Sequence, residues 1–250
     1  MAIKLYQFAL SHYCEKARWA LDYKGLDYER INLVPGPHFF KLKRMASKSS
    51  VPVIDDGGVL VQDSTDIITY LDEKYFQKPL TPLEGDLKKE AIDLEEYCDQ
   101  EIGVHLRRYF YNTLLHDRPL VTSLLLQDGP RYGPVLYAIM FPVVRTLMRR
   151  SMNISPESAK RSEKRLMDGI ETLNKILSKR KFLVGESFTR ADLSASALTA
   201  PLVWPKEHDF RWPNVFPEPL ASFRRDHEKD PFYSWVLKMY REYRLSSRVF

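Results

Sequence analysis

The sequence changes character near residue 77, and this change limits the folds that the chain can adopt. Before it, short β-prone segments alternate with helical patterns. After it, apolar residues recur every three or four positions, which is the spacing of amphipathic helices. The segment 77–86 (QKPLTPLEGD) between the two patterns holds two prolines and a glycine, as a linker does. We therefore predict a first domain at 1–76, a linker at 77–86 and an all-helical domain at 87–250.

The first domain reads as a βαβ unit followed by a short helix, a hairpin and a final helix. The expected elements are strand 3–8, helix 12–23, strand 28–33, a helical piece at 40–45, a hairpin of 51–54 with 59–62, and a helix that starts at 63–66. A βαβ unit makes its two strands parallel with a right-handed crossover. This order of elements is typical of a thioredoxin-like domain, so we expect an α/β first domain joined to an all-α second domain.

Several helices of the second domain carry their own start signals. Apolar positions from Ala91 to Phe110 predict one long amphipathic helix. Ser155-Pro156 and Asp230-Pro231 each place a capping residue before a proline at the first helical position. The stretch 135–144 is the most apolar in the chain and predicts a buried helix, within a segment 117–153 to which no function is assigned.

Residues Phe188 to Leu193 (FTRADL) form the most complete of these start signals. Thr189 can cap the following helix while Asp192 reaches back to the capping backbone. Phe188 can then pack on Leu193 as a hydrophobic staple. We expect this element to be structural.

Composition excludes several classes of function. Only two cysteines occur, Cys14 and Cys98, without a CxxC pair, which excludes a disulfide scaffold, a zinc ribbon and a cysteine-ligated cluster. The glycine-rich phosphate loops are absent as well. The histidines show no metal-ligand spacing, so we expect no metal. The net charge of +5 comes from scattered basic residues, which indicates solvated helix faces rather than nucleic-acid binding.

No leader peptide or membrane span is expected from the sequence. The first ten residues lack a charged leader followed by a long apolar core. No window approaches the ~20 apolar residues that a span requires. We therefore expect a soluble, cytoplasmic protein with no membrane partner.

Four motifs together resemble the cytosolic glutathione transferase superfamily over nearly the whole chain. They are Ser11 to Arg18 (SHYCEKAR), Val51-Pro52, Asp63-Ser64, and Gly185 followed by Thr189 to Asp192. Their order and spacing carry the resemblance. It implies a homodimeric detoxification enzyme, of a serine-dependent or atypical bacterial-like class, with glutathione as co-substrate and a small hydrophobic electrophile as second substrate.

The resemblance assigns three positions to glutathione, and each has a physical basis. Pro52 removes a backbone donor at the sheet edge, where Val51 can pair with an extended peptide through main-chain hydrogen bonds. Ser64 opens a helix whose N-terminus favours the γ-glutamyl carboxylate. Asp63 can hold the α-ammonium of the ligand. Each pattern is also compatible with a purely structural role, as a strand-start proline or as a helix cap.

The glycine carboxylate of glutathione requires a cation. His38 resembles the loop histidine of some classes, and Lys48 can substitute for the lysine that the family commonly has where this chain has Ser50. Both residues are also explained as exposed loop charges.

Ser11 and Cys14 occupy the two ends of a thioredoxin-type CxxC motif whose first cysteine is replaced by serine. A serine at the first position cannot form a mixed disulfide, but its hydroxyl can donate to a bound thiolate. Lowering a thiol pKa from about 8.5 by ~2 units takes only ~2.7 kcal/mol. We rank Ser11 first as the catalytic residue, Cys14 second and Tyr6 third. The family's usual proline after the first motif position is His12 here.

Two alternatives remain open from the sequence. Cys14 as a redox nucleophile makes the protein a glutaredoxin-like thiol transferase, and loss of chemistry makes it a non-catalytic binding or regulatory protein with the same fold. The electrophile pocket is expected between the domains, with four candidate aromatic residues: Tyr109, Tyr111, Tyr137 and Trp204.

Overall fold

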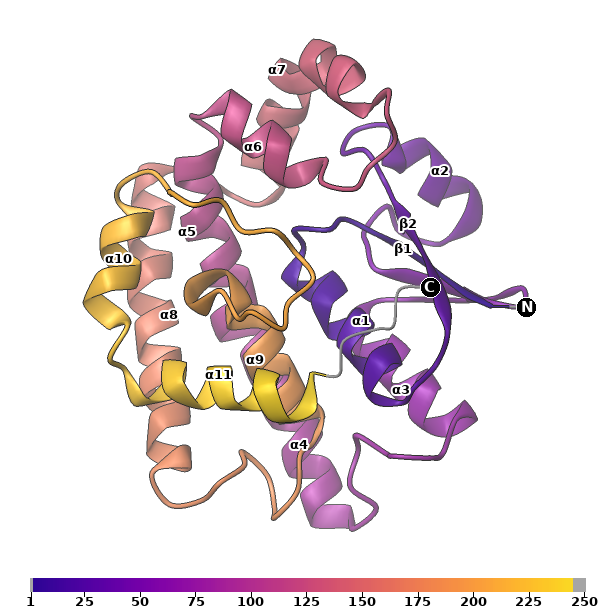
Figure 1. The fold of residues 1–250 in the computed structure, drawn as a ribbon, viewed down its shortest axis with the longest axis vertical. Coiled ribbons are helices and arrows are strands. Elements are labelled where there is room, and N and C mark those ends of the chain that lie inside the picture. The colour runs from indigo at the N-terminus through magenta and orange to yellow at the C-terminus, as the bar shows by residue number, and fades with distance from the viewer. Residues whose placement is uncertain (1, 245–250) are drawn as a thin grey trace.

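The computed structural model describes residues 2–244, and it contains a small sheet domain beside a larger helical one (Figure 1). Residue 1 of the predicted first domain and residues 245–250 of the predicted second domain lie outside the described residues. In chain order the elements are β1 (Ile3–Gln7), α1 (His12–Tyr23), β2 (Tyr28–Asn32), α2 (His38–Met45), β3 (Val53–Asp56), β4 (Val59–Gln62), α3 (Ser64–Lys74), α4 (Gly85–Tyr97), the π-helical turn η1 (Cys98–Gly103), α5 (Val104–Leu114), α6 (Arg118–Leu125), α7 (Gly133–Ser151), α8 (Pro156–Leu177), α9 (Arg190–Val203), α10 (Leu220–His227) and α11 (Pro231–Tyr243).

The four strands form one mixed sheet in the order β2-β1-β3-β4. Strand β1 pairs with β2 in parallel and with β3 antiparallel, and β3 pairs with β4 antiparallel. The predicted βαβ unit and hairpin are therefore confirmed, as is the fold class. Helix α4 begins at Gly85, inside the predicted linker, and the domain boundaries stay a prediction.

Alternate side chains of β1 serve two different cores. Leu5 faces the large core, which also holds Ala17 of α1 and Ile67 of α3. Tyr6 faces the opposite side, where it packs with Leu42 of α2. Because successive side chains of a strand point to opposite faces, one strand can anchor helices on both sides of the sheet.

Helix α9 lies at the centre of the helical domain, and every one of its residues is buried. The predicted capping box is present: the backbone N–H and Oγ1 of Thr189 both donate to Asp192 Oδ2 at 2.9 Å. Asp192 Oδ1 also accepts from Leu183 N at 2.8 Å. Phe188 stacks on Tyr243 with ring centroids 4.4 Å apart, which ties this element to the end of α11.

The long helix predicted from Ala91 to Phe110 is divided by the π-helical turn η1. Tyr13 of α1 donates its hydroxyl to the carbonyl oxygen of Asp99 in this turn, at 2.9 Å. Gly103 allows this close approach, because a Cβ added there would lie only 2.6 Å from Tyr13 Oη. Wide turns of this kind inside α-helices frequently mark functional sites.

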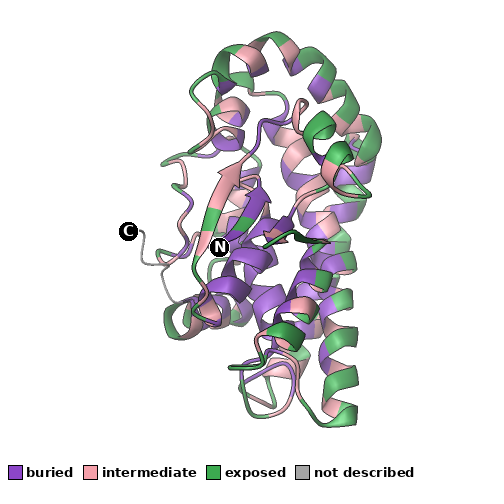
Figure 2. Cartoon of the chain, turned by 90° about the vertical axis from the view of Figure 1, so that its right-hand side faces the viewer, coloured by how far each residue is buried: buried purple, intermediate pink, exposed green. Residues whose placement is uncertain are grey.

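The prediction for 135–144 is correct in that the segment is helical, but the predicted burial of this helix is wrong. This segment belongs to α7, which buries Tyr137 but exposes Val135 by 69% and Ile139 by 75%. Figure 2 shows exposed residues along the top of the molecule, where Figure 1 places α7. The stretch is apolar on both faces, so composition could not show that only one face meets the core. Across residues 2–244, no helix combines the length and apolar content required to cross a membrane.

Candidate functional site

A cleft of about 450 Å³ lies where the N-terminal end of α3 meets α1 and the long helix of the second domain. It brings together the predicted Val51, Pro52, Asp63 and Ser64. Ser11, Cys14, His38 and Lys48 do not line it. The other lining residues are Tyr13, Ser50, Thr65, Asp66, Glu96, Asp99, Gln100 and Arg107.

The loop before β3 presents an unpaired backbone to this cleft. The Val51–Pro52 peptide bond is cis, and within residues 2–244 no hydrogen bond to the N–H or C=O of Val51 is found. Gln62 of β4 holds the loop in place, since its Nε2 donates to the carbonyl oxygens of Lys48 and Ser50 at 2.8 Å. The main-chain groups of Val51 are therefore open to a hydrogen-bonding partner, and the binding role of Val51 stays a prediction. The role of Gln62 was not predicted.

Asp63 and Ser64 open α3 at the edge of the cleft. Asp63 has φ 94°, which is unusual for a non-glycine residue and is typical of strained positions at functional sites. Its Oδ1 accepts from Thr65 N at 2.9 Å, so it caps the helix. Ser64 is the first helical residue and is only 2% exposed. The free N–H groups of this helix end are suited to a carboxylate.

Directly behind this helix end lies a buried charge cluster that the sequence did not reveal. Lys16 Nζ contacts Asp99 at 2.7 Å and Glu95 at 3.0 Å. Thr65 Oγ1 lies 3.1 Å from an oxygen of each carboxylate and can donate its one proton to either, and Arg190 pairs with Glu95. Five separate elements, α1, α3, α4, η1 and α9, supply these residues, and only the fold brings them together.

The ionisable groups of this cluster differ in the direction of their pKa shifts. Burial favours the neutral acid, yet Lys16 and Arg190 hold the pKa of Glu95 below its ordinary value. Burial outweighs Lys16 at Asp99 and raises its pKa. The pKa of Lys16 lies above its usual range despite burial, because of these two carboxylates. The network thus fixes Thr65, and with it the N-terminal end of α3, against the second domain.

Ser11 lies at the N-terminal end of α1, beside the cleft. It is the capping residue, and its half-buried Oγ accepts from Cys14 N at 3.3 Å. Cys14 is fully buried, and burial raises the pKa of its thiol. His12 is also buried. Burial, together with the charges of Arg107 and Lys16, lowers the pKa of His12 to about 3, so the ring is neutral.

The two predicted cations for the glycine carboxylate, His38 and Lys48, lie outside the lining of the cleft. His38 Nδ1 accepts from Gly36 N at 3.0 Å, and its ring packs edge-on against Phe8. Burial lowers the pKa of His38, which favours the neutral form. Lys48 is exposed in the loop that Gln62 holds.

Of the four aromatic residues expected at an electrophile pocket, only Tyr111 is near α1 and Arg107. Tyr111 is partly buried, and its electrostatic neighbours are Arg107 and Cys14. The other three belong to packed regions. Tyr137 is fully buried, Tyr109 packs on Phe223, and Trp204 packs on Phe216 and Trp212. Tyr13 and Arg107, which do face the cleft, were not predicted as site residues.

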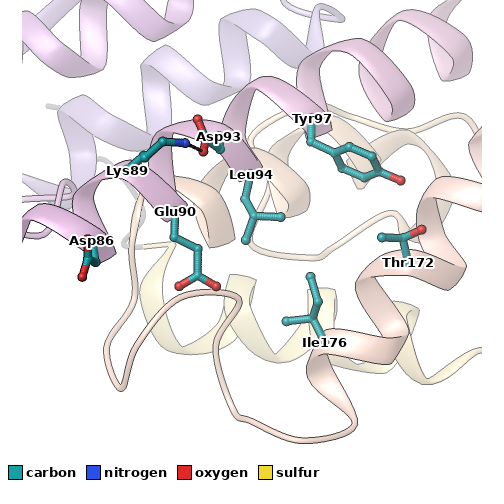
Figure 3. Close-up of a pocket in the computed structure, with 8 residues that line it drawn as sticks. All are labelled: Asp86, Lys89, Glu90, Asp93, Leu94, Tyr97, Thr172 and Ile176. Atoms are coloured by element: carbon teal, nitrogen blue, oxygen red, sulfur yellow. Dashed lines mark hydrogen bonds and ion pairs between the residues drawn. The ribbon is translucent and has the colours of Figure 1, made fainter.

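A second hollow of about 500 Å³ lies between α4 and the end of α8, away from the predicted residues (Figure 3). An ion pair of exposed residues, Lys89 and Asp93, lies on its rim. None of the predicted site residues lines it, so we assign the candidate site to the smaller cleft. Within the described part of the chain, no cluster of three or more His, Cys, Asp or Glu is arranged to hold a metal ion.

Together, the sheet domain with an open backbone at Val51, the serine-capped helix and the all-helical second domain define a thioredoxin-like protein of two domains. Residues 5–79 match the family model for the glutathione S-transferase N-terminal domain, and residues 136–218 match the model for its C-terminal domain. The two models together match more than half of the chain. The chain belongs to the glutathione S-transferase superfamily.

Curated relatives match the chain in part. Glutathione S-transferase Z1 of Arabidopsis thaliana is 43% identical over 96 residues, which are 37% of this chain and 42% of that protein. The zeta-class glutathione S-transferase of Euphorbia esula is 37% identical over 99 residues, again 37% of this chain and 42% of that protein. The chain thus spans about two fifths of the length of the curated relatives it matches.

Solved structures match over nearly the full length at low identity. The β-etherase LigF of Sphingobium has a TM-score of 0.68 and 20% identity, with 97% of this chain and 96% of that chain covered. A glutathione S-transferase of Methylobacterium radiotolerans, crystallised with glutathione sulfonate, has a TM-score of 0.58 and 22% identity, with 95% of both chains covered. These likenesses describe the fold.

Proposed function

We propose that this protein is a glutathione transferase that activates the thiol of bound glutathione for attack on a hydrophobic electrophile or a peroxide. The observation that carries the proposal is the cleft itself. It combines an unpaired backbone at Val51 with the free helix end at Ser64. A γ-linked tripeptide needs both features, since its cysteinyl unit pairs with a strand edge and its carboxylate binds a helix N-terminus.

The remaining contacts of glutathione follow from this orientation. Asp63 binds the α-ammonium, and the glycine carboxylate extends past Val51 and Pro52 toward His38 and Lys48. Lys48 is the better cation of the two, because His38 is biased to the neutral form. The proposal includes the division of the chain into 1–76, 77–86 and 87–250.

Ser11 is the residue we propose to stabilise the thiolate. Its Oγ accepts from Cys14 N and also hydrogen-bonds the Cys14 thiol, and we propose that its hydroxyl donates to the glutathione sulfur once glutathione is bound. The N-terminus of α1 adds a favourable dipole. The thiol loses its proton to solvent, and the sulfur then forms a bond with the electrophile, whose leaving group departs with the bonding electrons. No covalent enzyme intermediate is formed.

The buried state of Cys14 supports this assignment over the glutaredoxin-like alternative. A redox nucleophile needs an accessible, low-pKa thiolate, whereas Cys14 is inaccessible and its pKa is raised. The non-catalytic alternative is less well supported, because an interaction module does not need Val51 and Ser64 at one cleft together with a serine that caps α1.

Retention on glutathione resin, followed by assays for conjugation, peroxide reduction and disulfide reduction, tests the proposal. We expect wild-type retention, and we expect Ser11→Ala to lower kcat/KM for conjugation ~10-fold to 100-fold, as loss of one hydrogen bond to a charged group does. Cys14→Ala is the matched comparison and should keep conjugation. Survival of activity in Ser11→Ala with its loss in Cys14→Ala would instead favour the thiol transferase.

The proposal also includes a homodimer and a cytoplasmic site of action. Sedimentation velocity of the purified chain tests the first, with a species of twice the chain mass as the expected result. Cell fractionation tests the second.

A further inference from the structure

Arg107 of α5 is a cation that faces the cleft without an anionic partner. Its guanidinium carbon lies 5.7 Å from the ring centroid of Tyr13. Among residues 2–244, no ion pair or hydrogen bond to Arg107 is found. No other lysine or arginine lines the cleft in the described part of the chain. A partly buried guanidinium is costly to desolvate unless an anion compensates it.

The groups around Arg107 cannot supply that anion. His12 is neutral, because burial and Arg107 itself lower its pKa. Burial raises the pKa of Tyr111 to about 12 and that of Tyr13 even further, so both hydroxyls stay protonated. Of the acidic residues that line the cleft, Asp99 pairs with Lys16, and in the described part of the chain none of Asp63, Asp66 and Glu96 forms an ion pair with Arg107. The anion that completes this site must therefore come from a ligand.

The position of Arg107 along its helix separates it from the glutathione contacts. Arg107 follows Gln100 by seven residues, which is ~10 Å along a helix. Gln100 and Asp99 lie beside the α3 end of the cleft, whereas Arg107 lies over Tyr13 at the N-terminal end of α1. This is the end where, under the proposed function, the glutathione sulfur meets Ser11 and the second substrate.

We propose that Arg107 binds an anionic group of the electrophile, so that the preferred second substrates are aromatic or apolar electrophiles that carry a carboxylate. The inference rests on the proposed function. The guanidinium fork fits a carboxylate through two parallel hydrogen bonds. The ring of Tyr13 provides an apolar wall beside the guanidinium.

A pair of electrophiles that differ only in charge tests this inference. We would measure kcat/KM for 4-chloro-3,5-dinitrobenzoate and for its methyl ester, with wild type and Arg107→Gln. In Arg107→Gln, kcat/KM for the acid should fall ~10-fold to 100-fold, the range expected for loss of hydrogen bonds to a charged group. The kcat/KM for the ester should change less than ~3-fold, because the uncharged ester makes no ionic contact with Arg107. Arg107→Lys should recover part of the loss.

Arg161→Gln is the matched control, since Arg161 is exposed on α8 and its removal changes the net charge equally. It should affect neither substrate. An equal loss with acid and ester in Arg107→Gln overturns the inference, since Arg107 then acts on the thiolate. Loss of retention on glutathione resin also overturns it, since Arg107 then holds glutathione.

A binding measurement separates failure of this inference from failure of the proposed function. Calorimetry with the unreactive analogue 4-methyl-3,5-dinitrobenzoate should show tenfold or greater weakening in Arg107→Gln. This result supports the anion site even if wild type turns over neither electrophile, which would defeat the proposed transferase alone. Equal binding of the analogue to both proteins overturns the inference.

Discussion

At the N-terminal end of α1, three neighbouring residues differ in their ionisation and access. Ser11 is half-buried and caps the helix, Cys14 is a buried thiol with a raised pKa, and His12 is a buried, neutral imidazole. Of these three residues, only Ser11 has a partly exposed side chain. Under the proposed function, this difference in access favours Ser11 over Cys14 as the residue that meets the glutathione sulfur.

His12 makes stability depend on pH. Its pKa is about 3 in the folded chain, against 6.5 when exposed, so the unfolded state binds more protons at mildly acidic pH. The stabilisation from keeping His12 neutral is complete above pH ~6.5 and is lost as the pH falls toward 3. We expect His12 to account for a loss of ~2 kcal/mol in unfolding free energy between pH 7 and pH 5.

Urea denaturation at the two pH values measures this effect in wild type and His12→Gln. The variant should lose less stability on acidification, with a residual loss from His208, whose pKa burial lowers to about 4. His116→Gln, at an exposed position, should retain the wild-type dependence. An unchanged slope in His12→Gln would contradict the assignment.

At the scale of elements, the segment from α4 through η1 to α5 determines the shape of the cleft. The π-helical turn brings the carbonyl of Asp99 to Tyr13 and places Gly103 against the same ring. The carboxylates of Glu95 and Asp99 meet Lys16 of α1 and Thr65 of α3. Helices α1, α3 and α4 and the turn η1 are therefore joined through one buried network.

Removing the charge of Glu95 should destabilise the protein strongly. Glu95→Gln leaves Arg190 buried without its carboxylate, and breaking such a pair costs about 3–5 kcal/mol. The measurement is the midpoint of urea unfolding at pH 7. Asp93 lies two residues before Glu95 and forms an exposed ion pair with Lys89. Asp93→Asn breaks that pair, so it is the control and should barely shift the midpoint. Similar small shifts in both variants would show that the network is not a source of stability.

At the scale of the whole molecule, the two domains share one large core rather than meeting at a polar interface. Trp19 of α1 stacks on Phe188 and donates its Nε1–H to the carbonyl of Tyr243 at 3.0 Å. Arg244 is buried and donates to Glu15 of α1 at 2.8 Å. Residues 243 and 244, at the C-terminal end of α11, are therefore packed against the first helix.

This shared core predicts that both domains unfold together. Tryptophan fluorescence, which includes Trp19 at the interface, and far-UV circular dichroism, which reports helix content, should give coincident urea transitions. Two separated transitions, or a fluorescence change that precedes the loss of helix, would contradict a single cooperative unit.

Much of the fold could be predicted from the sequence, because the patterns that specify its helices and strands are local. Capping residues, proline positions and the alternation of strand residues act within a few positions, so the βαβ unit, the hairpin and the starts of α8, α9 and α11 were predicted correctly. The helix at 135–144 was predicted buried because its composition is apolar, and composition does not state which face a neighbour covers.

The sequence by itself determined the order of the elements, the family resemblance, and the residues Val51, Pro52, Asp63 and Ser64 that the cleft brings together. Each of these depends on local propensity or on motif spacing. Tertiary structure alone decided that Tyr13 and Arg107 face the cleft, that Cys14 is inaccessible, and that Lys16 meets Glu95 and Asp99. Burial depends on how the helices pack, and so does contact between residues some eighty positions apart. That packing cannot be inferred from any short segment of the sequence.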